Sequence, residues 1–204
     1  GLGQRVYAFP NDQLDRAMTT VFLHTRLHGL HGAGRTALDL HGVRHNLGVQ
    51  ETWVLWGDGP ARLPAWYVER FPAHYVGSRL FNWADESLPA MTVGTPPGVQ
   101  AGLRVSVPER ALLEMLFEVG VHQSLEEARQ LFENLRPPRR ELLARLLECC
   151  TSVKAVRLFL TWARETRLLD VDKLLADYTL PVGSDSRWMT RLKDGTLLSL
   201  RPHG

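Results

Sequence analysis

The second half of the chain reads as a series of amphipathic helices, and their boundary signals are the strongest constraint on the fold. In the stretch SVPERALLEMLFEVG, Ser106 and Glu109 have the spacing of a capping box, and Pro108 falls in the first turn. A second pair, Ser124 and Glu127, opens SLEEARQLFENL in the same way. Helical periodicity therefore predicts a packed array of helices in this half.

The array continues through two longer helices and a short one, and a hairpin follows it. The prolines at 137–138 end one helix and start RRELLARLLECC, and Thr151 or Ser152 caps the next stretch, TSVKAVRLFLTWARE. A last short helix is predicted at 171–178. The Asp-Gly dipeptide at 194–195 separates two runs of alternating character, which is the strongest short signal for a β-hairpin.

The first half mixes short strands with short helices. Strands are predicted in ETWVLWG, at 74–81 and in GLRVSV, because these runs are rich in β-branched and aromatic residues. Two short helices are predicted at 36–41, closed by Gly42, and at 65–70. A longer helix should start at residue 11 or 12, with a buried face formed by Leu14, Ala17, Met18, Val21, Phe22 and Leu27.

Together these elements predict an α+β fold: a small mixed β-sheet with flanking helices, followed by a helical array and a C-terminal β-hairpin. We expect an α/β half at 11–106 and a helical half with the terminal hairpin at 107–204. Residues 1–10 have the alternation of a strand entered in its middle. The least regular part, 84–102, is rich in Pro and Gly and predicts a long loop or a strand with a wide turn.

Several protein classes are excluded by composition. No run approaches the roughly 18 consecutive apolar residues of a membrane helix, and no basic segment precedes an apolar run with a cleavage site. The only cysteines, Cys149 and Cys150, are adjacent, a spacing that very rarely closes a disulfide. They also offer no CxxC motif for zinc, and we interpret them as small core residues. We expect a cytoplasmic protein.

No catalytic constellation emerges from the motifs. Five histidines fall within 22 residues, but HExxH, a P-loop, a G-x-S-x-G elbow and a GxGxxG after a strand are all missing; the histidines are His24, His28, His31, His41 and His45. We therefore expect no enzymatic activity, no cofactor and no metal. The alternative is a metal-dependent nuclease or nucleotide-processing enzyme whose carboxylates, such as Asp39, Glu51 and Asp58, converge from distant segments.

Positive charge is concentrated toward the C-terminus. Residues 1–128 carry 10 Lys and Arg against 13 Asp and Glu, and residues 129–204 carry 14 against 9. In TSVKAVRLFLTWARE, basic residues share a helical face apart from the apolar stripe, so this face is either a nucleic-acid contact surface or the solvated back of a core helix. A surface that binds phosphate backbones without reading sequence, or an acidic protein partner, is predicted at Arg139, Arg140, Arg145, Lys154, Arg157, Arg164, Arg187, Arg191 and Lys193.

Several stretches, in their order along the chain, resemble the C-terminal domain of AbiEi-type antitoxins of type IV toxin–antitoxin (abortive infection) systems. The most specific are RTALDLHG, SVPERALLEML and SVKAVRLFL. The resemblance covers about residues 5–200 and is one of pattern and order, since none of these pieces is a catalytic motif. It implies that a winged helix-turn-helix domain precedes this one, that residues 1–10 are the exit strand of its wing, and that this chain lacks the operator-reading helix.

The resemblance also implies a function. The full protein would repress its own operon, and the C-terminal domain would counteract a nucleotidyltransferase-like toxin and assist cooperative DNA binding. The implied partners are operator DNA, bound through the full-length protein, and the cognate toxin, whose antagonism need not involve direct contact. The tail SRWMTRLKDGTLLSLRPHG departs from the lysine- and glycine-rich hairpin of the family. A plain dimerisation or toxin-docking module is the other alternative, and exposed aromatic residues such as Trp188 or Trp66 would indicate it.

Overall fold

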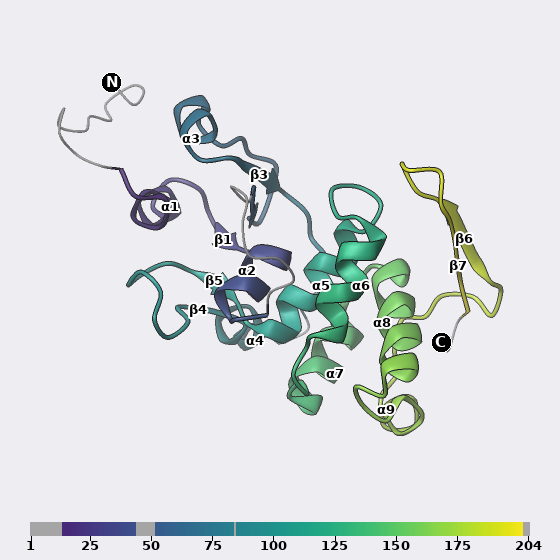
Figure 1. Ribbon diagram of the computed structural model, residues 1–204. Coiled ribbons are helices and arrows are strands. Elements are labelled where there is room, and N and C mark those ends of the chain that lie inside the picture. The colour runs from purple at the N-terminus through teal and green to yellow at the C-terminus, as the bar shows by residue number, and fades with distance from the viewer. Residues whose placement is uncertain (1–13, 44–51, 84, 202–204) are drawn as a thin grey trace.

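A mixed β-sheet and a helical array pack side by side in the computed structural model, which describes residues 14–43, 52–83 and 85–201 (Figure 1). The sheet has the strand order β3-β2-β1-β5-β4. The β1–β5 and β2–β3 pairs are parallel, and the β1–β2 and β4–β5 pairs are antiparallel. The strands are β1 (His31–Gly32), β2 (Trp53–Trp56), β3 (Ala73–Val76), β4 (Val93–Gly94) and β5 (Val105–Ser106).

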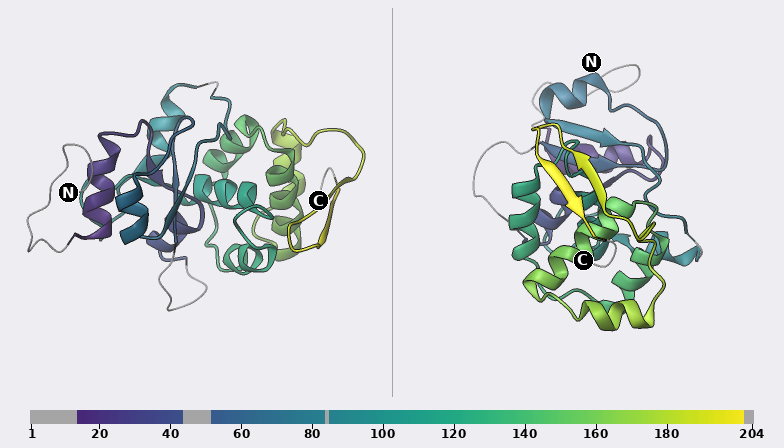
Figure 2. Two further views of the ribbon diagram at one scale, coloured as in Figure 1. Left: turned by 90° about the horizontal axis from the view of Figure 1, so that it is seen from above. Right: turned by 90° about the vertical axis from the view of Figure 1, so that its right-hand side faces the viewer.

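The helices divide between the two parts of the molecule. Among the described residues, the helices that accompany the sheet are α1 (Arg16–His24), α2 (Gly34–Leu40), α3 (Ala65–Arg70) and α4 (Ser87–Met91). The array is formed by α5 (Pro108–Glu118), α6 (Leu125–Glu133), α7 (Arg140–Cys149), α8 (Val153–Thr166) and α9 (Val171–Asp177). A separate antiparallel hairpin, β6 (Trp188–Arg191) and β7 (Leu197–Leu200), lies at the end of the molecule opposite α1 (Figure 2). These observations confirm the α+β class.

Helix α5 lies at the centre and joins the two parts. It packs against α2 on the sheet side and against α7 and α8 on the array side. Leu112, Leu113 and Leu116 are all less than 2% exposed, and burying a leucine contributes roughly 1.5–3 kcal/mol. One hydrophobic core runs from Val54 in the sheet to Leu200 in the hairpin. The core is therefore continuous across residue 106. The expected division of the chain into two halves at this residue stays a prediction.

The predicted capping box at the start of α5 is wrong. The helix begins with Pro108 as expected, but its N-cap residue is Val107, which makes no side-chain cap. Ser106 instead donates to Glu114 (2.8 Å), and Glu109 accepts hydrogen bonds from Arg139. Both side chains are engaged in contacts with other parts of the fold, so neither one caps the helix.

Two other caps follow the prediction. The hydroxyl of Ser124 accepts from the Glu127 amide at the start of α6, and Ser152, rather than Thr151, caps α8. The short helices at 36–41 and 65–70, the strand in ETWVLWG and the Asp-Gly hairpin are also confirmed. The strand expected at 74–81 ends earlier, at Val76. The irregular segment 84–102 contains α4 and β4.

The buried face predicted for α1 is partly confirmed, since Ala17, Val21 and Leu27 pack against hydrophobic clusters, but its centre is rotated. Thr19, Thr20 and Leu23 are the buried residues, whereas Met18 and Phe22 are exposed. The cause is a tertiary hydrogen bond of 2.7 Å between the hydroxyls of Thr20 and Tyr67, which turns a polar residue inward. Residues 1–13, including the predicted exit strand and helix start, lie outside the described part.

Within the described residues, no helix is both long enough and apolar enough to cross a membrane.

Candidate functional site

The basic residues predicted as a surface fall into three groups, and the first consists of exposed or half-buried arginines paired with carboxylates. Such exposed pairs contribute little to stability, but each places a negative charge against the guanidinium. The positive potential of this group is therefore locally compensated. The pairs are Arg139 with Glu109 (2.8 Å), Arg140 with Asp177 (2.6 Å), Arg164 with Asp172 (2.5 Å) and Arg145 with Asp85.

The Arg139–Glu109 pair is the most strongly held of these. Arg139 donates through its backbone amide, Nε and a terminal nitrogen, at 2.8–2.9 Å, to a carboxylate that is 4% exposed. Burial opposes ionisation of Glu109, but these hydrogen bonds outweigh it and lower the pKa of the carboxyl group. Arg139 therefore fixes the α6–α7 connection to α5 and offers few free donors to a phosphate.

The second group lies on α8 and faces inward. The expectation of an exposed basic face at Lys154 and Arg157 is wrong for Arg157, which is 1% exposed. Its guanidinium donates to the carbonyls of Val182 (2.7 Å), Ser186 (2.8 Å), Leu200 (3.3 Å) and Ser184. The tail and hairpin cover this face of the helix, which the pattern alone showed as polar. Arg157 is thus an anchor for the C-terminal segment.

Lys154 is half-buried and caps the end of another helix. Its ammonium group donates to the carbonyls of Phe117 (2.5 Å) and Val119 (2.7 Å) at the C-terminus of α5. Burial lowers the pKa of Lys154, and the nearby Glu118 carboxylate partly counteracts that shift. Cations at a helix C-terminus satisfy carbonyls that the helix leaves unpaired. Lys154 is therefore also engaged in the fold.

The third group lies on the hairpin and is the most open to a partner. Arg187, Arg191 and Lys193 are exposed, and within the described part of the chain none of them pairs with a carboxylate. The sequence from residue 187 to residue 201 contains four basic residues and one acidic residue, Asp194. The alternation of β6 and β7 also exposes Met189 and Leu197. The outer face of the hairpin thus combines positive charge with apolar side chains.

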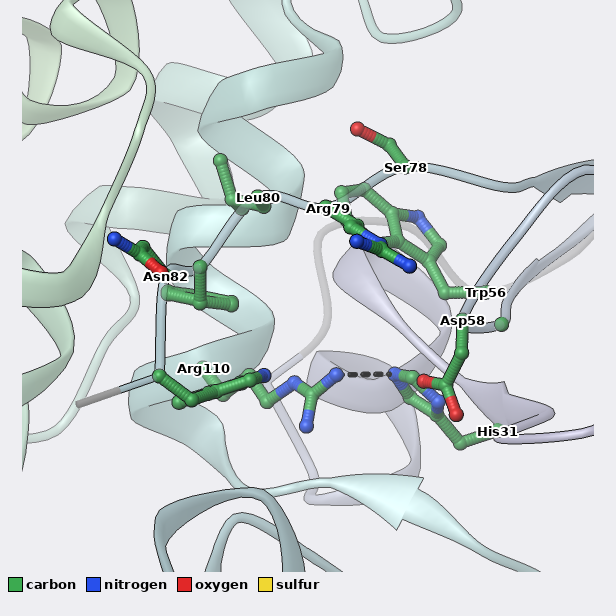
Figure 3. A pocket seen from close by; sticks show the side chains of 11 residues that line it. His31, Trp56, Asp58, Ser78, Arg79, Leu80, Asn82 and Arg110 are labelled. Carbon is green, nitrogen blue, oxygen red and sulfur yellow. Dashed lines mark hydrogen bonds between the residues drawn. The ribbon is translucent and has the colours of Figure 1, made fainter. Parts of the chain in front are cut away.

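A cavity of about 350 Å³ opens where the sheet meets α5 (Figure 3). His31 at the start of β1 and Arg110 on α5 point toward each other there, with 3.2 Å between a terminal arginine nitrogen and Nε2 of His31. Nδ1 of His31 lies 2.7 Å from the Gly29 carbonyl and donates to it, and Nε2 also lies 3.2 Å from Oε1 of Glu114. The other lining residues are Trp56, Gly57, Asp58, Ser78, Arg79, Leu80, Phe81, Asn82 and Trp83.

Behind this cavity, Glu114 is completely buried and fully hydrogen-bonded. It accepts from Nε of Arg110 (2.8 Å), the hydroxyl of Ser106 and the backbone amide of Gly34 (3.1 Å). Burial opposes its ionisation, but the positive charge of Arg110 and the hydrogen bonds from neighbouring side chains together outweigh that effect and keep the pKa of Glu114 below its ordinary value. The network ties α5 to α2 and β5, so its role is structural.

The two alternatives from the sequence find little support. Neither Asp39 nor Asp58 belongs to a cluster with metal-ligand spacing within the described residues, and Glu51 lies outside them. Trp66 and Trp188 are half-buried and pack against hydrophobic clusters, so neither is the exposed aromatic residue that a docking module would present.

The histidine pairs singled out in the sequence do not form metal sites in the described residues. Burial lowers the pKa of His24 to about 4, and His28 pairs with Asp58 on the surface (2.6 Å). His45 lies outside the described part. A different group, His74, Glu118 and His122, has metal-ligand spacing. Glu118 and His122 stand at i, i+4, a signal available in the sequence, but only the fold brings His74 to them.

Comparison with known proteins gives two adjacent family matches. Residues 50–200 match the model of the transcriptional regulator, AbiEi antitoxin, type IV toxin–antitoxin system, and residues 1–49 match the AbiEi antitoxin N-terminal domain of a transcriptional regulator. No curated protein and no solved structure matches the chain. The boundary at residues 49 and 50 falls between β1 and β2, which pair with each other in one sheet.

Proposed function

The chain belongs to the family of AbiEi antitoxin transcriptional regulators of type IV toxin–antitoxin systems, and from this membership we propose that its C-terminal hairpin contacts the phosphate backbone of operator DNA. The family is one of regulators rather than enzymes, and we propose that this chain catalyses no reaction. The toxin that it opposes is, in this proposal, nucleotidyltransferase-like and need not be bound directly. The site of action is the cytoplasm.

The single observation that carries the proposal is the difference between paired and unpaired cations. Arg140, Arg145 and Arg164 on the helices already face carboxylates, whereas Arg187 and Arg191 on the hairpin face none in the described residues. A phosphate that approaches the hairpin displaces only water and counterions, while one that approaches the helices must compete with Asp or Glu. Backbone contacts of this kind supply affinity and orientation without reading sequence.

The hairpin is also held firmly enough to serve as a contact surface. Leu198 and Leu200 of β7 are buried against the core, and the guanidinium of Arg157 binds carbonyls on both sides of β6. Lys193 Nζ donates to the Val121 carbonyl (3.0 Å) and so joins the hairpin to the α5–α6 turn. A surface with fixed positions loses less conformational entropy on binding than a free tail does.

The test is fluorescence anisotropy of a labelled mixed-sequence DNA duplex, titrated with the 204-residue chain across salt from about 50 to 200 mM. The informative variant is Arg187→Gln/Arg191→Gln. If both side chains contact phosphates, the slope of log affinity against log salt should decrease by about 2, since each contact contributes roughly 0.9.

The matched control is Arg140→Gln/Arg164→Gln, which removes the same formal charge from paired positions. It should leave the slope within about 0.5 of the wild-type value, because those guanidinium groups already face carboxylates. Equal slopes for the wild type and the hairpin variant would contradict the proposal, as would a larger change in the control than in the hairpin variant.

A further inference from the structure

Three potential metal ligands meet between the edge of the sheet and the end of α5. His74 lies on β3, Glu118 is the last residue of α5 and His122 follows in the α5–α6 turn. Oε2 of Glu118 is 2.7 Å from Nδ1 of His122 and 3.4 Å from Nε2 of His74. The three ligand atoms all lie within 4.8 Å of one another. One carboxylate oxygen therefore faces two imidazole nitrogens.

The polar atoms of this cluster are not fully satisfied without a further partner. Among the described residues, the buried Nε2 of His74 makes no hydrogen bond, although Oε2 of Glu118 lies 3.4 Å away. An unpaired buried polar atom costs about 1–3 kcal/mol. Glu118 is 5% exposed.

The donor set suits one class of ion. Two imidazole nitrogens and one carboxylate oxygen form the set of three protein ligands found in tetrahedral zinc sites, whose fourth position is left for water or substrate. Tetrahedral bonds of about 2.0–2.1 Å place ligand atoms roughly 3.3 Å apart. Oε2 of Glu118 already lies at about this distance from Nε2 of His74. The shorter distance between Oε2 of Glu118 and Nδ1 of His122 would have to increase modestly. The His122 side chain is half exposed in a turn and can move outward.

We propose that His74, Glu118 and His122 bind a divalent metal ion of the zinc class, with the fourth position open to solvent. Lys154, the neighbouring cation, donates to the carbonyls of Phe117 and Val119 and is engaged outside the cluster. On the open side, His122 lines a cavity of about 210 Å³ together with Asp194 of the hairpin. Bound metal would tie β3 to the α5–α6 turn and so stabilise the folded state.

The experiment uses the 204-residue chain and the metals alone. Co²⁺ replaces Zn²⁺ at such sites and in four-coordinate geometry shows intense visible d–d absorption, which a six-coordinate surface ion lacks. Metal binding releases protons from the ligands, so the titration is run in buffer at about pH 7.5. One equivalent of Co²⁺ should produce this spectrum, and Zn²⁺ should abolish it. Calorimetry with Zn²⁺ should give a stoichiometry of one.

His122→Ala is the decisive variant, because this half-exposed turn residue can be removed with little cost to folding. Loss of a direct ligand should weaken Zn²⁺ binding by at least about 100-fold, the upper end of what loss of an outer-shell partner costs. Its matched control is His28→Ala, which removes a surface histidine that also pairs with a carboxylate. The control should keep the wild-type affinity and spectrum.

Thermal unfolding supplies a second readout for variants that fold poorly. Zn²⁺ should raise the melting temperature of the wild type and of His28→Ala, and should leave that of His122→Ala and His74→Ala unchanged. The proposal is overturned if Co²⁺ gives only weak six-coordinate absorption, or if His122→Ala binds Zn²⁺ as tightly as the wild type does. Neither result would bear on the proposed DNA contact of the hairpin, because the DNA-binding experiment is carried out without metal.

Discussion

Arg110 and Arg157 are both buried, but the fold neutralises them in different ways. Arg110 binds a carboxylate, Glu114, one turn along the same helix. Within the described residues, Arg157 donates only to backbone carbonyls, which come from the segment between Val182 and Leu200. In the first case a formal charge compensates a formal charge within α5. In the second, oriented dipoles compensate the charge, and the contact exists only when the C-terminal segment is in place.

The largest effect is expected from Arg110→Leu. This change leaves the Glu114 carboxylate buried without its cation, and such uncompensated charges typically cost about 3–5 kcal/mol. Urea denaturation measures the free energy of unfolding. The double variant Arg110→Leu/Glu114→Leu should recover most of the loss, because it removes both charges. A double variant no more stable than the single one would show that the carboxylate is not the source of the cost.

A smaller and more local effect is expected from Arg157→Met. The methionine keeps apolar contact but leaves several carbonyls unpaired, at a total cost of about 2–3 kcal/mol, since some of these groups can find water. Hydrogen exchange should then show that amides of β6 and β7 open before those of α5. Uniform loss of protection over the whole chain would contradict the assignment of Arg157 as an anchor of the tail.

The smallest effect concerns pH and separates the two arginines directly. The pKa of Glu114 lies below its ordinary value of 4.5 in the folded state, so its contribution to stability is present above pH 4.5 and is lost as pH falls through the folded-state pKa. Carbonyls do not titrate. As pH falls below about 4.5 the cost of Arg110→Leu should therefore decrease, while that of Arg157→Met stays constant. If the destabilisation caused by the two substitutions changed with pH in the same way, the two arginines would not differ in how their charge is compensated.

The sequence was sufficient for those features of the fold that depend on local patterns. Helical periodicity, Pro108, the caps at Ser124 and Ser152 and the Asp-Gly turn each act within a few residues, and the structure confirms them. The features that were wrong depend on distant partners. Thr20 is buried and its hydroxyl hydrogen-bonds to that of Tyr67, and Ser106 donates to Glu114 instead of capping α5.

The candidate sites follow the same division. No local signal marked Arg157 as buried, because Lys154, Arg157 and Thr161 fall together on one polar face of the helix. The C-terminal segment covers Arg157 only in the folded chain. The hairpin cations could be named from the sequence alone because an alternating strand must expose every second side chain. His74 could not be assigned to Glu118, because no local rule connects a residue on β3 with the end of α5.

The place of β1 in the sheet has a consequence for synthesis on the ribosome. Gly32 pairs with Leu55 on one side and with Val105 on the other. The pairing with β5 can form only after the ribosome has added about 70 more residues. At roughly 5–20 residues per second, this delay is about 4–14 seconds. During that interval the nascent chain presents an open strand edge beside β1, and this is the period in which it is most exposed to pairing with a neighbouring chain.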